Sequence, residues 1–412
     1  MKWVEKSDIE AFLNHKNYDV RVSGNGRWID QKCTPDVVSI VADCIIAYAD
    51  LLPHTTKFTS MDIWHSEYTE QNILDIFKKP GTENHAARNE YDKFFQQPME
   101  LLAYSGVLVK TKIGSRNFYS IGSRDILEFI ALSERNALKF LQIYIEKVLS
   151  DTGLIDTFNW FFNHPNQNNY ISVKDAFTHM TKTYTRINGD TESWRIFIKV
   201  INPLAFKNNS YGTEKGRISK DPITYDMLMY NRDNFRDIYS NKPKGLTRNE
   251  YLMQIGVSPN IAYSAYSSSK AKKYLRLFND TFRKGLTEVD VDLITEPAIQ
   301  MHHIFPEAQF PDICAFYENL IALTPNQHFI NAHPNGNTSR IDRKYQYKCL
   351  LCKLKNICDN SMSHTEEHIY NKRSFLKILD IGLNTDEFEQ MSSFSYDLIV
   401  EKLNAYYPEM VA

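Results

Sequence analysis

The chain has 412 residues, of which 42% are hydrophobic and 24% charged, a balance that is ordinary for globular proteins. This length predicts two or three domains, and the formal net charge of −2 excludes a strongly basic protein, so the whole-chain balance does not by itself indicate a nucleic-acid binder. No apolar run approaches the length of a membrane span, and the first residues do not read as a signal peptide, so we expect a cytoplasmic protein without membrane partners.

The cysteines fit a reducing compartment, because six of them in a chain of this length do not make a disulfide framework. Cys349 and Cys352 form a CxxC pair that could suggest zinc. No second pair follows, and the histidines further along lack the spacing of a zinc finger. We therefore expect buried cysteines on a helix in this part of the chain.

The N-terminal region, residues 1–65, mixes helical and turn-rich stretches. A helix is predicted from Pro35 with Thr34 as its N-cap, and the turn Asn25-Gly26 predicts a hairpin. Asp30 and Lys32 fit the loose carboxylate–lysine pattern of the PD-(D/E)xK nucleases, a second way to bind Mg²⁺ and activate water. The pattern is short, and a charged surface hairpin is the favoured reading of it.

Residues 66–125 have the outline of a winged-helix DNA-binding region. Thr69 is expected to cap one helix, and a second helix is expected to run to about residue 104 with an interruption near Pro98. Two alternating strands then flank a turn and form a basic hairpin, the shape of a wing. The DNA contacts expected on this hairpin come from Lys110, Lys112 and Arg116. Any other small α+β subdomain is the alternative.

A helical scaffold is expected at 126–206, followed by a basic region at 207–285. Between residues 207 and 284 there are 15 Lys and Arg against 7 Asp and Glu, and tyrosines interleave with them. Phosphate backbones respond to such local fields rather than to the total charge. DNA contacts are predicted for Lys215, Arg217, Lys220, Arg232 and Arg236. A solvated charged face is the alternative.

The segment that carries chemistry lies in residues 286–345. The stretch 299–306 reads as a strand that delivers His302 and His303 to a turn, and 319–323 reads as a second strand. Thr324-Pro325 then starts a helix, with Thr as the cap and Pro at the first position, and His328 falls on this helix. The predicted order is therefore strand, long loop, strand and helix, with histidines at both ends.

This arrangement resembles the HNH (ββα-metal) nucleases, in particular restriction endonucleases and colicin-type nucleases, over about forty residues. The resemblance implies that His302 and His328 bind a metal ion, and that His303 is the general base that takes a proton from the attacking water. It also implies that Asn319 fixes the loop and orients the base. His333 is the candidate for the second metal-binding histidine on the helix.

The spacing of His328 and His333 departs from the family pattern, because they are five residues apart where four is usual. Five residues rotate about 140° beyond a full turn of an α-helix, so we expect the helix to end early. Asn331 and Asn337 are the alternative ligands. Ordinary core or capping histidines, or a structural zinc site, are the alternatives to a catalytic centre.

The expected fold is α+β, mainly helical, with a winged-helix-like N-terminal region, the HNH module at 286–345 and a helical brace at 346–412. The resemblance implies hydrolysis of double-stranded DNA with Mg²⁺, or with Mn²⁺ or another divalent cation. Because most of the chain lies outside the module, we expect a sequence-specific type II restriction endonuclease, for which a homodimer at cleavage is one arrangement. A homing or phage-defence HNH nuclease, or a DNA-binding protein with an inactive nuclease module, is the alternative.

Overall fold

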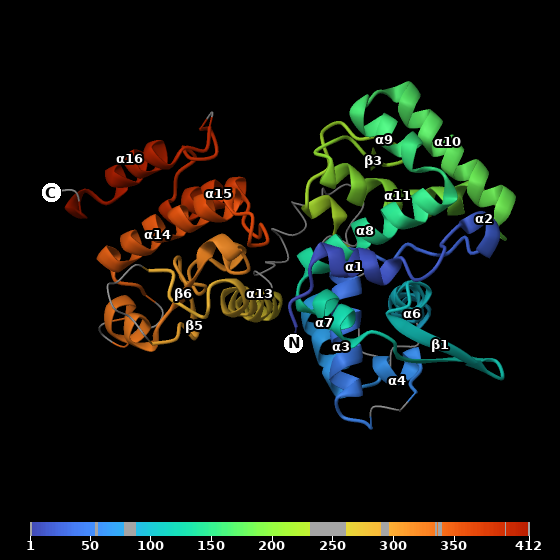
Figure 1. Ribbon diagram of the computed structural model, residues 1–412, viewed down its shortest axis with the longest axis horizontal. Helices are drawn as coiled ribbons and strands as arrows, with labels where there is room; N and C mark the ends of the chain where they lie inside the picture. The colour runs from blue at the N-terminus through green and yellow to red at the C-terminus, as the bar shows by residue number, and fades with distance from the viewer. Residues whose placement is uncertain are drawn as a thin grey trace, which may run out of the picture. The chain divides into compact units, whose positions relative to one another are not determined.

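The computed structural model describes residues 2–53, 57–77, 88–230, 261–289, 296–333, 336, 340–391 and 393–410. The chain divides into two compact units, residues 1–255 and 256–412. The described residues are mainly helical, with small two-stranded antiparallel sheets, so the α+β, mainly helical class is confirmed (Figure 1). Among these helices, none has both the length and the apolar character needed to cross a membrane. The finer division into six regions stays a prediction.

The first unit is built from helices with two short hairpins. Its elements are α1 (Lys6–Leu13), α2 (Val20–Ser23), α3 (Pro35–Ala49), α4 (Ser60–Trp64), α5 (Glu67–Phe77), α6 (Arg88–Tyr104), β1 (Leu108–Ile113), β2 (Arg116–Ile121), α7 (Arg124–Leu132), α8 (Glu134–Thr152), α9 (Ile155–Asn163), α10 (Gln167–Tyr184), α11 (Asp190–Lys207), β3 (Thr213–Glu214), β4 (Arg217–Ile218) and η1 (Asp226–Leu228). Helix α3 is mostly apolar, is buried from Pro35 to Ile45 and packs against α7 and α8, as expected for a helix at the centre of a core.

Three local expectations in the first unit are corrected. The hairpin expected at Asn25-Gly26 is absent from the described residues, because α2 precedes it and ends at Gly24 in the left-handed region, φ 65°. Helix α5 begins before Thr69, so this residue does not cap it. Helix α6 continues through Pro98 without a break. The helix from Pro35 is confirmed, although the Thr34 hydroxyl donates to the Asp36 carboxylate instead of capping.

The expected basic hairpin is confirmed as strands β1 and β2, which pair antiparallel from Leu108 opposite Ile121 to Ile113 opposite Arg116. Its basic residues are not equivalent. The Nζ atom of Lys110 lies 2.6 Å from a carboxylate oxygen of Glu100 on α6, so part of its charge is neutralised within the protein. That this region is a winged helix that contacts DNA stays a prediction.

The second unit carries the predicted site. Its elements are α13 (Ile261–Phe282), β5 (Gln300–His303), η2 (Pro311–Ile313), η3 (Tyr317–Asn319), β6 (Leu320–Leu323), η4 (Gln327–Ala332), α14 (Arg343–Met362), α15 (Lys372–Leu383), α16 (Tyr396–Tyr406) and η5 (Pro408–Met410). Strand β6 is buried along its whole length and shares one apolar core with α14, α15 and α16. Helix α13 belongs to this unit, although its sequence fell in the basic region 207–285.

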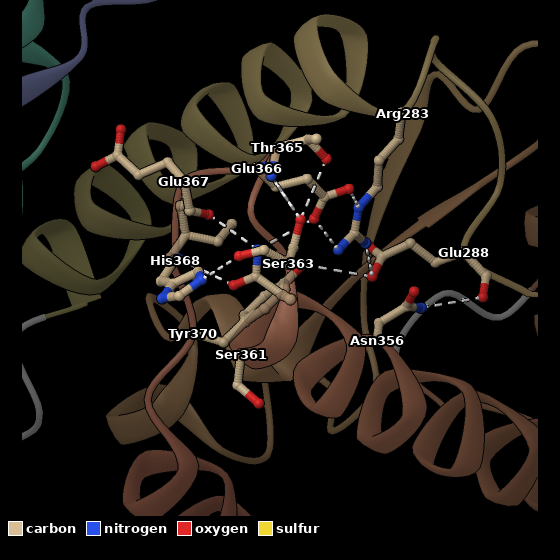
Figure 2. Close-up of polar contacts among 12 residues, drawn as sticks. Arg283, Glu288, Asn356, Ser361, Ser363, Thr365, Glu366, Glu367, His368 and Tyr370 are labelled. Atoms are coloured by element: carbon tan, nitrogen blue, oxygen red, sulfur yellow. Dashed lines mark hydrogen bonds and ion pairs between the residues drawn. The ribbon is translucent and has the colours of Figure 1, made fainter.

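A buried ionic network around Glu288 holds strand β6 in place. Glu288 makes a backbone hydrogen bond to Ala322 and also accepts from its amide through the carboxylate. The other carboxylate oxygen of Glu288 lies 2.6 Å from Nζ of the fully buried Lys353 and 3.4 Å from Arg283. Figure 2 shows the Arg283 guanidinium reaching both Glu288 and Glu366. Because the charges are paired and hydrogen-bonded, they can remain buried and connect β6 to α14 and to the segment directly after α13.

Candidate metal centre

Strands β5 and β6 place the two adjacent histidines at one end of a small sheet. They pair antiparallel, with His302 opposite Ile321 and His303 opposite Leu320. Successive residues of a strand point to opposite faces, so the two rings leave the sheet in different directions. The strand thus provides two separate imidazoles, one on each side.

His302 meets His328 and His333, the two histidines of the segment after β6. The ring centroids are 5.1 Å apart for His302 and His328 and 4.9 Å apart for each of the other two pairs. One ring nitrogen of each residue lies within 4.8 Å of those of the other two. In the described part of the chain no other group of metal-ligating side chains converges in this way. The cysteines of α14 do not join it; Cys349 is buried as expected, whereas Cys352 and Cys358 are only partly buried.

The backbone of η4 explains how histidines five residues apart reach one point. The segment is a π-helical turn, closed by a hydrogen bond of 3.2 Å from the His333 amide to the His328 carbonyl. In a π-turn the amide of residue i+5 donates to the carbonyl of residue i. Two histidines five residues apart therefore lie one above the other on the same side of the turn. The α-helix that we expected over this stretch, ending early to accommodate His333, is therefore corrected. His333 joins the cluster, whereas Asn331 is exposed and Asn337 lies outside the described residues.

The hydrogen bonds around the three rings suit a bound cation. Nδ1 of His333 lies 2.6 Å from the Arg340 carbonyl, which can only accept, so this nitrogen carries the proton and Nε2 keeps its lone pair. Nε2 of His302 and Nδ1 of His328 are buried and have no hydrogen-bond partner among the described residues. Buried ring nitrogens without partners are rare unless something else binds them. The three imidazoles therefore fit a divalent metal ion.

The protonation states agree with this reading. Burial, followed by the neighbouring rings of His328 and His333, holds the pKa of His302 well below its ordinary value. Burial also lowers the pKa of His328, with His333 and Lys272 adding to the effect. A neutral imidazole is the form that binds metal, so these two ligands need no deprotonation near pH 7.

His303 is separate from the cluster and is held in one tautomer. Its Nε2 lies 2.9 Å from the Cys314 carbonyl, so Nε2 carries the proton and Nδ1 has the free lone pair. Burial, and then the positive charge of Lys272, lowers the pKa of His303 to about 4. The ring is therefore neutral at physiological pH and can accept a proton at Nδ1.

Asn319 connects the strands to the long loop between them. Its Oδ1 accepts from the Phe305 amide at 2.8 Å, and its Nδ2 donates to the carbonyls of Phe305 and Ile313 at 3.1 and 3.2 Å. The side chain is fully buried. The loop that it fixes begins directly after His303, so Asn319 sets the position of that ring through the backbone.

Replacing Asn319 with Ala should destabilise the second unit markedly. The change leaves the Phe305 amide and carbonyl without their Asn319 partner and the Ile313 carbonyl with only the Phe316 amide, which should lower the free energy of unfolding by about 3 kcal/mol. Urea unfolding measures this, with Asn326→Ala as the control because Asn326 is exposed and bonds only to Glu296 among the described residues. Equal stability of the two variants would contradict the assigned role of Asn319.

The residues expected to contact DNA all belong to the first unit. The exposed ones are Lys110, Lys112, Arg116, Lys215, Arg217 and Lys220. Arg232 and Arg236 lie outside the described residues. DNA contact by any of them stays a prediction, and the Lys110–Glu100 pair makes Lys110 the least available.

The alternative carboxylate–lysine site lies in a turn before α3 rather than on a sheet. Asp30 is buried and pairs with Arg27, and Lys32 donates to the Tyr230 hydroxyl at 2.6 Å. Both side chains therefore have structural partners. This geometry fits a structural role better than metal-dependent catalysis.

Sequence reasoning missed three polar residues near His303. Ser268 and Lys272 come from α13, and Glu307 follows β5; their side chains meet beside the imidazole. Lys272 was visible only as one member of a charge run, and no motif connected α13 with residues some thirty positions later. The signal that links them is tertiary packing.

Comparison of the chain with models of known protein families, with curated proteins and with solved structures finds no match. The residues of the site and their geometry are therefore what indicates a function for this chain.

Proposed function

We propose that this protein is a metal-dependent endonuclease of the HNH class that hydrolyses double-stranded DNA. The observation that carries the proposal is that, in the second unit, three histidines converge while a fourth, His303, lies apart from them. His302, His328 and His333 converge through ring nitrogens within 4.8 Å of one another, while His303 stands apart with a free Nδ1. A cluster of structural histidines would not require this division.

The chemistry of phosphodiester hydrolysis accounts for each part. His303 is neutral near pH 7, so its Nδ1 can take a proton from the attacking water, as a general base does. Asn319 holds the loop that fixes the His303 ring. His302, His328 and His333 would hold a divalent cation, which supplies Lewis acidity toward the phosphate.

The ligand set bears on which cation is used. Mg²⁺ prefers oxygen ligands, whereas imidazole nitrogen suits Mn²⁺, Co²⁺, Ni²⁺ and Zn²⁺ better. All three converging side chains are imidazoles. We therefore propose that activity is higher with one of these transition metals than with Mg²⁺.

The finer proposal is a sequence-specific type II restriction endonuclease. It is supported by the exposed basic side chains of the first unit, at the β1–β2 and β3–β4 hairpins, which lie in a part of the chain separate from the histidine cluster. Such a division suits a protein that selects where to cut. A homing or phage-defence nuclease is the alternative with the same chemistry, and a DNA-binding protein with an inactive nuclease module is the alternative without it.

Digestion of several plasmids tests these proposals together. With Mn²⁺, Zn²⁺ or Mg²⁺ we expect a small set of discrete bands, and with EDTA no cleavage. A continuous smear with metal would support a nuclease but contradict sequence specificity. Intact plasmid under every metal condition would contradict the proposed nuclease activity.

A further inference from the structure

Helix α13 lies directly against the predicted site. It packs on β5, β6, η2 and η3. Its Ser264 carbonyl accepts from the Cys314 thiol at 3.4 Å, and Tyr274 stacks on Tyr317 with ring centroids 4.6 Å apart. Side chains on this face of α13 are therefore held in fixed positions relative to His303.

One carboxylate oxygen of Glu307 lies close to the polar groups beside His303. It accepts from the Ser268 hydroxyl at 2.9 Å and lies 3.9 Å from Nζ of Lys272 and 3.8 Å from Nδ1 of His303. An anionic oxygen at this place thus lies close to an ammonium group and to the nitrogen assigned as the base. The ammonium group suits a phosphate oxygen under attack, and the base nitrogen is close enough to take the proton of a water that attacks the same phosphate.

The positive charge of Lys272 also acts on the neighbouring histidine rings. Burial is the main cause that lowers the pKa values of His302, His303 and His328, and the positive charge of Lys272 adds to it. Its side chain is 37% exposed, so a substrate can reach it from solvent. Lys272 therefore lies next to the carboxylate beside His303 and remains open to solvent.

We infer that Lys272 is a further catalytic residue, whose ammonium group binds a non-bridging oxygen of the scissile phosphodiester in place of the Glu307 carboxylate. The inference rests on the proposed function. In the reaction, the water oxygen forms a bond to phosphorus and its proton passes to Nδ1 of His303. The bond from phosphorus to the leaving oxygen breaks, and that oxygen takes a proton from solvent. Negative charge grows on the non-bridging oxygens during this step, and Lys272 stabilises it.

Turnover of bis(p-nitrophenyl) phosphate tests this role in the full-length protein, because so small a diester reaches only the site itself. Lys272→Ala should lower kcat by about 10²-fold, the usual effect of losing one donor to a developing oxyanion. Lys272→Arg should recover part of the rate because the charge remains. Lys273→Ala is the matched control: it removes the same charge from the next, exposed position, about 100° around the helix, and should leave the rate unchanged.

A binding measurement separates catalysis from folding. The ³¹P relaxation of dimethyl phosphate, titrated with Mn²⁺-loaded protein, gives its Kd. Lys272→Ala should weaken this binding about tenfold, whereas Glu307→Gln should tighten it several-fold because a competing anion is removed. A merely structural role of these two residues would shift the Kd in the same direction.

The outcomes distinguish the two proposals. If the wild-type protein cleaves neither plasmid nor the small diester, the proposed function fails and the role of Lys272 fails with it. If the wild-type protein is active but Lys272→Ala behaves like Lys273→Ala, only the role of Lys272 is overturned. Weaker dimethyl phosphate binding by Glu307→Gln would likewise overturn it while leaving the nuclease proposal standing.

Discussion

Replacing His303 with Ala should lower the rate of DNA cleavage by between 10²- and 10⁴-fold, roughly the contribution of a general base. The affinity for the metal ion should not change, because His303 is not among the three converging rings. Single-turnover cleavage of a plasmid measures the rate, and metal titration of the same variant measures the affinity. Added imidazole should restore part of the activity by entering the space that the side chain leaves.

Two outcomes would contradict this role of His303. The first is cleavage by His303→Ala at the wild-type rate, which would mean that the reaction takes place at another site, such as the one around Asp30. Asp30→Ala provides the comparison, and we expect this variant to retain cleavage if it folds. The second is loss of metal from His303→Ala, which would make His303 a ligand rather than a base.

Replacing His302 with Ala should strongly weaken metal binding and, with it, DNA cleavage. The ring centroid of His302 lies within 5.1 Å of the ring centroids of His328 and His333. A site that loses one of three ligands should bind its cation at least about 10²-fold more weakly. The stabilisation by the metal should disappear as well, since ligand that binds only the folded state raises Tm. Calorimetric titration and thermal unfolding with and without Zn²⁺ measure the two effects.

The control for His302→Ala is His364→Ala, which removes an exposed imidazole from the same unit and should retain both the affinity and the Tm shift. His333→Ala should behave like His302→Ala. A Tm shift by Zn²⁺ that survives in the His302 and His333 variants would place the metal elsewhere and contradict the proposed centre.

The sequence predicted the backbone of the site well because short-range signals define it. The stretch 299–306 was predicted as a strand that delivers His302 and His303 to a turn, and Thr324-Pro325 indicated the start of a helical segment after β6. Asn319 was assigned through the resemblance, and its side chain does bond the loop on both sides. These features depend on residues close together in the chain, where propensity and capping carry most of the information.

The parts that sequence reasoning missed depend on packing and backbone register. No residue type is specific for a π-turn, so the five-residue spacing of His328 and His333 seemed unsuitable for two ligands of one metal ion on a helix. Lys110 could not be paired with Glu100 before α6 and the hairpin were placed together. Ser268 and Lys272 reach the site because α13 packs on the sheet, a contact between segments about thirty residues apart. Tertiary structure decides each of these cases.

X-ray absorption spectroscopy of the Zn²⁺-loaded protein tests the central claim most directly. We expect one zinc ion per chain with three imidazole ligands, an unchanged spectrum in His303→Ala and a changed one in His302→Ala. A spectrum with cysteine sulfur, or one that changes in His303→Ala and not in His302→Ala, would contradict the metal centre described for this protein.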